Sequence, residues 1–467
     1  MARVISRYLA PVYLLSCLLL GGASAAGYMA NGALQVAGLF CILIVVLAGL
    51  LPQLPRPAQL LLVLTAAAAA LLLFELIPLP PFLWQLLPGR SDVAEGYSLL
   101  GMAAPWLPIS LSPSGTLAQL TSLIPIVAVI VLVCASSGYG RLFSVYVIIG
   151  TAIVSIVLGL LQKMQGPDSL YYIYDVTNRG GVVGFFANRN HLATLLLATI
   201  PFIAALAVSP RRDSKQDDSK IGRLMVTGCL AMFVAVGVIV VRSSAGWMLL
   251  PPVMFASVAV FLRGENGKVP SALLQVGSLI AVICVVASIV APIKMNDLGD
   301  KLSGMDPHMR NQSIRTTAGA ALNYLPFGSG GGSFVQVYPR YENVETASLE
   351  YLNHAHDDYV EVALEHGLPG IALIALAAGL WFVRARRLWR QGKGDALSRA
   401  GSIVIAIVFA HSLVDYPLRT AAMAAVAAFA FALMVAPESA EMPNWQSARR
   451  RKHRGKSMRT IEIALAD

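Results

Sequence analysis

The sequence predicts an all-α, polytopic membrane protein with about twelve transmembrane helices and a large loop outside the membrane. Of its 467 residues, 57% are hydrophobic and only 13% are charged, and the mean hydropathy is +0.68. A soluble domain usually has about a quarter charged residues. Apolar runs long enough to span a bilayer recur along the whole chain, and basic residues gather in the loops between them.

The candidate transmembrane helices lie at approximately residues 9–26, 34–51, 58–79, 117–135, 142–164, 191–208, 224–241, 246–262, 271–293, 368–383, 401–418 and 419–436. The first run follows Arg3 and Arg7 and precedes Ala23-Ser24-Ala25, a pattern that also fits a signal peptide. A second run follows directly, which favours an uncleaved first helix.

The basic residues predict the direction of these helices, because the cytoplasmic loops of membrane proteins are enriched in lysine and arginine. With both termini in the cytoplasm, every basic cluster falls on the inside. The clusters are Arg211–Arg223, Arg263–Lys268, Arg384–Arg399 and Arg449–Lys452. The net charge of +10 therefore indicates cytoplasmic loops and not a nucleic-acid partner.

Three longer segments then face outward, at 80–116, 165–190 and 294–367. The last is the longest loop of the chain, and loops of this length are usually functional. We therefore divide the chain into a transmembrane domain, residues 1–436, which includes the 294–367 loop, and a basic tail, residues 437–467. The tail is expected to lie in the cytoplasm, where it can contact anionic membrane lipids.

A glycine- and asparagine-rich segment precedes the helix predicted at 191–208. It begins at Arg179 and continues through three glycines to Asn188, Arg189 and Asn190. Backbone N–H groups, amides and guanidinium groups at a helix start can bind an anion. The alternative is a turn whose amides only cap the helix.

Further arginines lie in the other outward segments. Arg242 follows an apolar run directly, where an arginine either binds a ligand or extends to the lipid headgroups. Arg310 and Arg315 open the second half of the long loop and precede a glycine cluster at 326–334. This cluster is no P-loop, because it lacks the Gly-Lys-Ser/Thr ending.

The segment Asn353–Gly370 is the sharpest candidate for chemistry. From Asp358 onward it predicts an amphipathic helix with Gly367 as its C-cap. His356 would lie at the amino-terminal end, where the helix dipole favours the neutral imidazole that can accept a proton. Asp357 or Asp358 could orient the ring.

Other interpretations of these residues stay open. A His-x-His followed by aspartate is also a metal-ligand pattern, and the segment could be a polar interfacial helix with incidental histidines. His366 is predicted to lie on the surface. The segment His411–Arg419 is interpreted as structural, with Asp415 and Arg419 as a possible pair that Pro417 disturbs.

Three stretches resemble the O-antigen ligase and polymerase superfamily of bacterial inner-membrane glycan transferases. They are Gly184–Ala193, Arg310–Phe334 and His356–Gly370, and the last is similar to the family pattern of a histidine followed by Gly-x-x-Gly. Two departures stand out: Asp357 replaces the usual amide or serine, and Ser244 stands where an arginine is expected. Arg242, two residues earlier, could replace that arginine.

The resemblance implies a GT-C-type, metal-independent and cofactor-free inverting glycosyltransferase that acts at the periplasmic face. The implied partners are an undecaprenyl-diphosphate-linked glycan, an acceptor glycolipid and the membrane lipids. His356 would be the general base. The side chains expected to bind diphosphate or glycan are Arg310, Arg242, Arg189, Arg179, Asn188, Asn190 and Arg315.

The function predicted from the sequence is therefore an O-antigen ligase-type transfer of glycan from undecaprenyl diphosphate to an acceptor hydroxyl, on lipid A-core or another acceptor. A polymerase that joins lipid-linked repeats is the first alternative. A lipid-linked glycan flippase is an alternative of another class. A transporter usually has repeat symmetry and charges near the membrane midplane, whereas the candidate residues here gather at one face.

Overall fold

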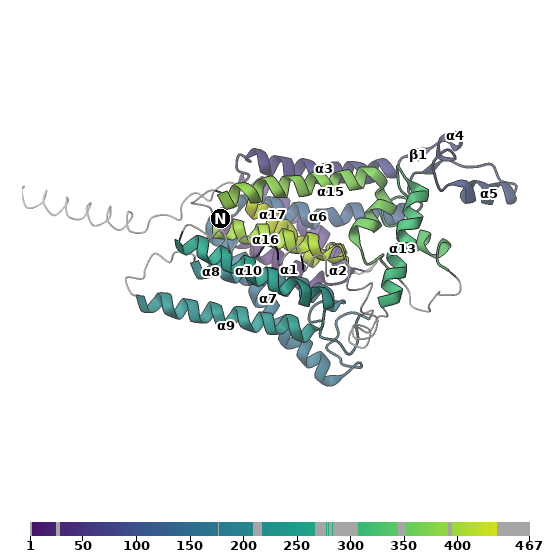
Figure 1. Cartoon of the computed structure of the whole chain (residues 1–467). Coiled ribbons are helices and arrows are strands. Elements are labelled where there is room, and N and C mark those ends of the chain that lie inside the picture. Colours follow the sequence, from purple (N-terminus) through teal and green to yellow (C-terminus); the bar gives the residue numbers. More distant parts are fainter. Residues whose placement is uncertain are drawn as a thin grey trace, which may run out of the picture.

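The computed structural model describes residues 2–24, 29–175, 177–208, 217–266, 307–343, 352–390 and 395–436, and three single positions between 277 and 283. The described residues form a helical bundle (Figure 1). Nine of the described helices are long and apolar enough to cross a membrane. They are α1 Ala2–Leu20, α2 Met29–Leu47, α3 Arg56–Glu75, α6 Pro113–Ala135, α7 Gly138–Gln165, α8 Arg189–Val208, α9 Asp217–Val241, α10 Ser244–Asn266 and α15 Asp358–Arg390.

Two shorter apolar helices complete the described bundle, α16 Ala396–His411 and α17 Ala421–Val435. The prediction of an all-α polytopic membrane protein is thereby confirmed. The described helices correspond to all the predicted spans except 271–293, which lies outside the described residues apart from single positions.

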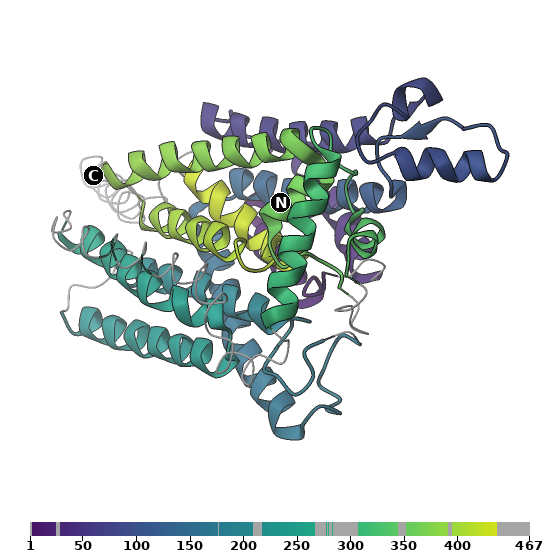
Figure 2. The same cartoon turned by 45° about the vertical axis from the view of Figure 1, so that its right-hand side comes forward.

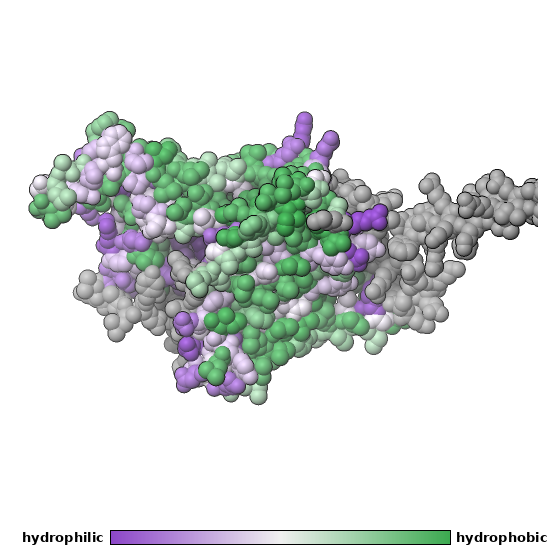
Figure 3. Space-filling view, turned by 180° about the vertical axis from the view of Figure 1, so that it is seen from behind, coloured by the Kyte–Doolittle hydropathy of each residue, from purple (hydrophilic) through white to green (hydrophobic). Residues whose placement is uncertain are grey.

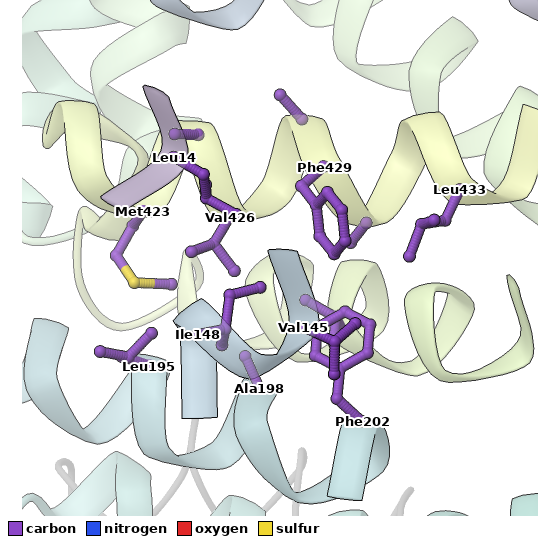
Figure 4. Packing of buried hydrophobic residues seen from close by; sticks show 14 of the residues in the cluster. Leu14, Val145, Ile148, Leu195, Ala198, Phe202, Met423, Val426, Phe429 and Leu433 are labelled. Atoms are coloured by element: carbon purple, nitrogen blue, oxygen red, sulfur yellow. The ribbon is translucent and has the colours of Figure 1, made fainter. Parts of the chain in front are cut away.

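Helix α8 forms the centre of the bundle. Its own leucine, alanine, isoleucine and phenylalanine side chains cover all of its faces, and a helix that is apolar all round is expected to be buried. Figure 4 shows Leu195 and Phe202 of α8 facing Ile148 of α7 and Phe429 of α17. The rings of Phe202 and Phe429 lie 5.7 Å apart. Alanine is frequent in α17, and such small side chains allow membrane helices to approach closely.

The outer helices expose apolar side chains, as expected for contact with lipid. Helix α2, for example, exposes Phe40 and Leu47. Figure 3 shows a broad hydrophobic area in the middle of one face, with hydrophilic residues toward its edges.

Short elements lie at one end of the bundle (Figures 1 and 2), and Figure 1 shows this end opposite the amino terminus. Helix α13, Pro307–Tyr324, runs across the helix ends and packs against α15. The shorter elements are β1 Pro78–Leu79, α4 Pro81–Trp84, α5 Ser91–Leu99, β2 Leu107–Pro108, α14 Phe334–Val337, η1 Tyr338–Arg340 and η2 Pro417–Arg419. Strands β1 and β2 pair antiparallel, with Pro78 opposite Pro108. The described parts of the three segments predicted to face outward thus lie at the same end.

Helix α15 has a kink at Gly367, where φ is 56° and ψ is −144°. A Cβ atom there would collide with the carbonyl oxygen of Pro326. The glycine therefore ends a first helical segment that begins at Asp358, as its sequence pattern predicts. Pro369 suits the first turn of the second segment, since a proline lacks the N–H that would be unpaired there.

Helices α16 and α17 are shorter than their predicted spans because a polar turn interrupts the apolar sequence between them. The 16 residues of α16 extend about 24 Å, less than the roughly 30 Å of a bilayer core. The turn at 411–420 is therefore recessed into the bundle. This recess holds most of the buried polar side chains that form the candidate site.

Candidate active site

His356 lies in the loop that leads into α15 and is 4% exposed. Its φ is 60°, and Arg242 (φ 58°) shares this left-handed conformation. Among the described residues, they are the two non-glycine residues with positive φ. Such a conformation costs on the order of 1 kcal/mol or more and persists only where the surroundings enforce it, often at functional sites. Both residues were candidates from the sequence.

The carboxylate beside the His356 ring is that of Asp415. The Nδ1 atom of His356 lies 3.5 Å from Oδ1 of Asp415, and both side chains are buried. Asp415 lies in the recessed turn, where its backbone N–H donates to the carbonyl oxygen of His411 over 3.0 Å. The segment interpreted as structural thus contributes a side chain to the candidate site.

The two aspartates expected to orient His356 have other contacts in the structure. Oδ1 of Asp357 accepts the backbone N–H groups of Tyr359 (2.9 Å) and Val360 (3.1 Å), so Asp357 caps α15. Burial raises the pKa of Asp357 to about 6, although these N–H groups oppose the shift. Asp358 accepts the hydroxyl of Ser412 over 2.7 Å. The orienting position beside the ring is therefore occupied by Asp415.

One tyrosine ring packs against three imidazoles. The ring centroid of Tyr416 lies 4.5 Å from that of His354, 5.0 Å from His356 and 5.2 Å from His191. His191 is 1% exposed, and neither of its ring nitrogens has a hydrogen-bond partner. The hydroxyl of Tyr416 donates to Asn353 over 3.4 Å. Tyr416 thus connects the start of α8 with the histidine loop, residues 352–357.

Arg419 lies near the end of the same turn and binds carboxylates of α15. Its guanidinium lies 3.4 Å from Asp358, 3.3 Å from Glu361 and 3.2 Å from Glu365. Burial alone would lower the pKa of Arg419, but the three carboxylates outweigh it and hold the pKa above its ordinary value. The pairing of Arg419 with Asp415 considered from the sequence is replaced by this contact with α15.

The glycine turn, residues 328–332, is held rigidly by its surroundings. The backbone N–H of Gly331 donates to Glu75 Oε2 over 2.9 Å, and that of Gly330 donates to the carbonyl oxygen of Glu365 over 2.7 Å. A Cβ atom at Gly328 would collide with the backbone of α15, so glycine is required for this close approach. The turn therefore anchors α15 to the end of α3.

His366 is mostly buried, contrary to the prediction that it lies on the surface. Its Nδ1 lies 2.7 Å from Glu75 Oε1, and its Nε2 lies 3.2 Å from Gln119 Oε1. The amide nitrogen of Gln119 donates to Glu365 over 2.8 Å, which assigns the amide oxygen to His366. Both ring nitrogens of His366 therefore face side-chain oxygens of other helices.

The asparagine segment before α8 is organised mainly by capping. The side-chain oxygen of Asn188 accepts the backbone N–H of Asn190 over 2.8 Å, and the backbone N–H of Arg189 donates to Asn178 over 3.1 Å. Arg179 is exposed, and its guanidinium donates to the carbonyl oxygen of Pro167 over 3.1 Å. The capping alternative thus accounts for the described contacts of Asn188, while ligand binding by this segment stays a prediction.

The remaining arginines lie around the same end of the bundle. Arg242 is exposed at the junction of α9 and α10, and Arg315 is exposed on α13. Arg310 lies in the first turn of α13, but its side chain is outside the described part of the structure. The contact of these arginines with diphosphate stays a prediction. Across the residues that the structure describes, no group of three or more His, Cys, Asp or Glu side chains could hold a metal ion.

Comparison with known proteins shows what the region around several of these residues is similar to. The model of the O-antigen ligase family matches residues 228–375. Residues 228–375 are thus similar to the O-antigen ligase family. The resemblance to the O-antigen ligase and polymerase superfamily is confirmed, and with it an activity of this general type. A search of curated proteins found no match to the chain.

The matched region includes Arg242, Arg310, Arg315 and His356. The recessed turn with Asp415 and Arg419 lies beyond it and was not recognised as part of the site from the sequence. A signal was present, because ionisable residues within a membrane domain are functional candidates by default. Their spacing of four residues suggested a local pair, which hid their long-range contacts.

Proposed function

We propose that the protein transfers a glycan from a polyprenyl diphosphate to an acceptor hydroxyl at the extracytoplasmic face of the bacterial inner membrane. His356 acts as general base, and Asp415 orients it. The observation that carries the proposal is the buried His356–Asp415 pair, in which His356 belongs to the region similar to the O-antigen ligase family. The ligase reaction, with lipid A-core or a similar glycolipid as acceptor, is the form we favour.

The arrangement of the pair supports a proton-accepting role. A carboxylate facing Nδ1 favours the tautomer with the proton on Nδ1 and the lone pair on Nε2. Nε2 can then accept a proton from an incoming hydroxyl. The 3.5 Å separation of His356 from Asp415 is long for a hydrogen bond, but catalytic contacts often shorten only when the substrate binds.

The reaction breaks one bond and forms one. The acceptor oxygen forms a bond to the anomeric carbon of the donor glycan while its proton moves to His356. The bond from that carbon to the diphosphate oxygen breaks, and its electron pair leaves with the lipid diphosphate. Displacement from the opposite side inverts the anomeric configuration. Arg310, Arg242 and Arg315 carry the charge needed to bind the diphosphate, since guanidinium groups match phosphate oxygens in bidentate fashion.

The test is glycan transfer by the detergent-purified protein with a polyprenyl-diphosphate oligosaccharide. Separate reactions offer lipid A-core and a second lipid-linked repeat as acceptors, each with EDTA. Product on lipid A-core supports the ligase form, and product on the second repeat makes the protein a polymerase. Movement of the donor across proteoliposomes without a new glycosidic bond would contradict the transferase and support a flippase.

A further inference from the structure

Arg419 contacts three acidic side chains that share one face of a single helix. Asp358, Glu361 and Glu365 are three and four residues apart on the first segment of α15, so all of them point in one direction. Each oxygen contact with the Arg419 guanidinium measures between 3.2 and 3.4 Å. All three carboxylates are buried.

Each carboxylate also binds a different segment of the protein. Asp358 accepts the hydroxyl of Ser412, at the end of α16. Glu365 accepts the amide of Gln119 from α6 and the backbone N–H of Phe334, the first residue of α14. Through one guanidinium, the turn between α16 and α17 is therefore connected to α6 and to the long loop.

Glu361 connects Arg419 with the histidine loop. Its Oε2 accepts the backbone N–H of Ala355 over 2.8 Å, and its Oε1 lies 2.8 Å from Nδ1 of His354. These two residues directly precede His356, whose left-handed backbone must be imposed by its neighbours. The carboxylate of Glu361 thus holds the loop on the amino-terminal side of the candidate base.

Arg419 is the guanidinium that contacts all three of these buried carboxylates. Without it, the carboxylates would repel one another, and Glu361 would gain by moving away from its neighbours or by taking up a proton. Either change weakens the hydrogen bonds that Glu361 makes with the Ala355 N–H and with His354. Lysine could replace the charge, but its ammonium is a compact donor that does not reproduce the planar guanidinium fork.

We propose that Arg419 is a positioning residue that holds the histidine loop through Glu361 and so keeps His356 in its reactive orientation. Asp415 approaches the ring itself, whereas Arg419 acts on the backbone that precedes it. The proposal deepens the glycosyl-transfer function and rests on it for the kinetic part of its test. Its structural part concerns the loop alone and can be measured without any substrate.

The structural test is hydrogen–deuterium exchange of residues 352–357 in detergent-purified, full-length protein. We expect Arg419→Ala and Glu361→Gln each to raise exchange of the Ala355 amide at least about tenfold, because both remove the ion pair that fixes the Glu361 side chain, which accepts the Ala355 N–H. Arg419→Lys should give a smaller rise. Arg384→Ala is the matched control, since that guanidinium binds the carbonyl oxygen of Met434 in a different part of the bundle. Equal exchange in wild type, Arg419→Ala and Glu361→Gln would overturn the proposal, whatever the activity.

The kinetic test is a double-mutant cycle on glycan transfer. Misplacing a catalytic group by about 1 Å can cost about 10²-fold. We therefore expect Arg419→Ala and Glu361→Gln each to lower kcat by about that factor, with little change in donor KM. The double variant should be no slower than the slower single variant, because both act through one contact. Multiplying losses would contradict action through Glu361.

Folding is checked by size-exclusion chromatography and thermal unfolding. If Arg419→Ala fails to fold, Arg419→Lys and Glu361→Gln carry the test alone, because Gln has nearly the volume of Glu. Wild type without transfer activity would count against the glycosyl-transfer function, and the exchange data would still decide the role of Arg419.

Discussion

The substitution Asp415→Asn changes the charge beside His356 with almost no change in volume. When His356 takes up the acceptor proton, an imidazolium forms 3.5 Å from the Asp415 carboxylate. At an effective dielectric constant of about 20, two full charges at that separation attract by about 5 kcal/mol. A transition state with half of the proton transferred would lose about half of this energy. Because 1.36 kcal/mol corresponds to a factor of ten, the expected loss in rate is about 60-fold.

Single-turnover glycan transfer with saturating donor measures this loss without interference from product release. Asp357→Asn is the matched control, because asparagine caps a helix about as well as aspartate and Asp357 caps α15. Asp357→Asn should therefore stay within about threefold of wild type. A rate within threefold of wild type for Asp415→Asn would refute the assignment. A large loss for Asp357→Asn instead would favour the assignment made from the sequence.

Three further predictions concern the kink, the pH dependence and the role of metal. Gly367→Ala should lower the free energy of unfolding by about 1 kcal/mol or more, because φ is 56° there and a Cβ atom would collide with the backbone of Pro326. Thermal unfolding measures the loss of stability, and an unchanged Tm would contradict the prediction. Burial raises the pKa of Asp357 to about 6, so between about pH 4 and 6 this carboxyl binds more protons in the folded protein than in the unfolded protein. The contribution of Asp357 to stability is therefore present below about pH 4 and is lost as the pH rises through 6. Asp357→Asn should flatten the stability–pH curve in that window, and an identical curve would refute the shift. EDTA should leave the rate of transfer unchanged, and loss of activity that Mg²⁺ or Mn²⁺ restores would overturn metal independence.

The fold could be predicted largely from the sequence because hydropathy and charge act locally in a membrane protein. A helix that satisfies its own backbone hydrogen bonds is one of the few structures that can cross a bilayer, so apolar runs such as that of α8 identify themselves. Gly367 could likewise be predicted as a helix end, because only its own conformation was needed. The end of α16 was predicted at residue 418 but lies at His411, because the predicted apolar span was continued through Leu413 and Val414 into the polar turn.

The site could be predicted only in part, because the contacts that form it join residues far apart in the chain. His356 stands out locally through its place before an amphipathic helix. Its neighbour Asp415 is 59 positions further along, and no local pattern indicates that the two meet. His366 was predicted at the surface because its partner Glu75, which comes from the third helix, is far away in the sequence. The sequence therefore indicated the reacting group but not the groups that position it.

The role of His356 in glycan transfer is the central claim, and single-turnover transfer by His356→Ala and His356→Gln against wild type tests it most directly. Loss of a general base usually costs about 10²–10⁴-fold. We expect a loss in that range for both variants, with donor binding preserved and with EDTA present throughout. Transfer at the wild-type rate by either variant would show that another group accepts the proton and would contradict the proposed mechanism.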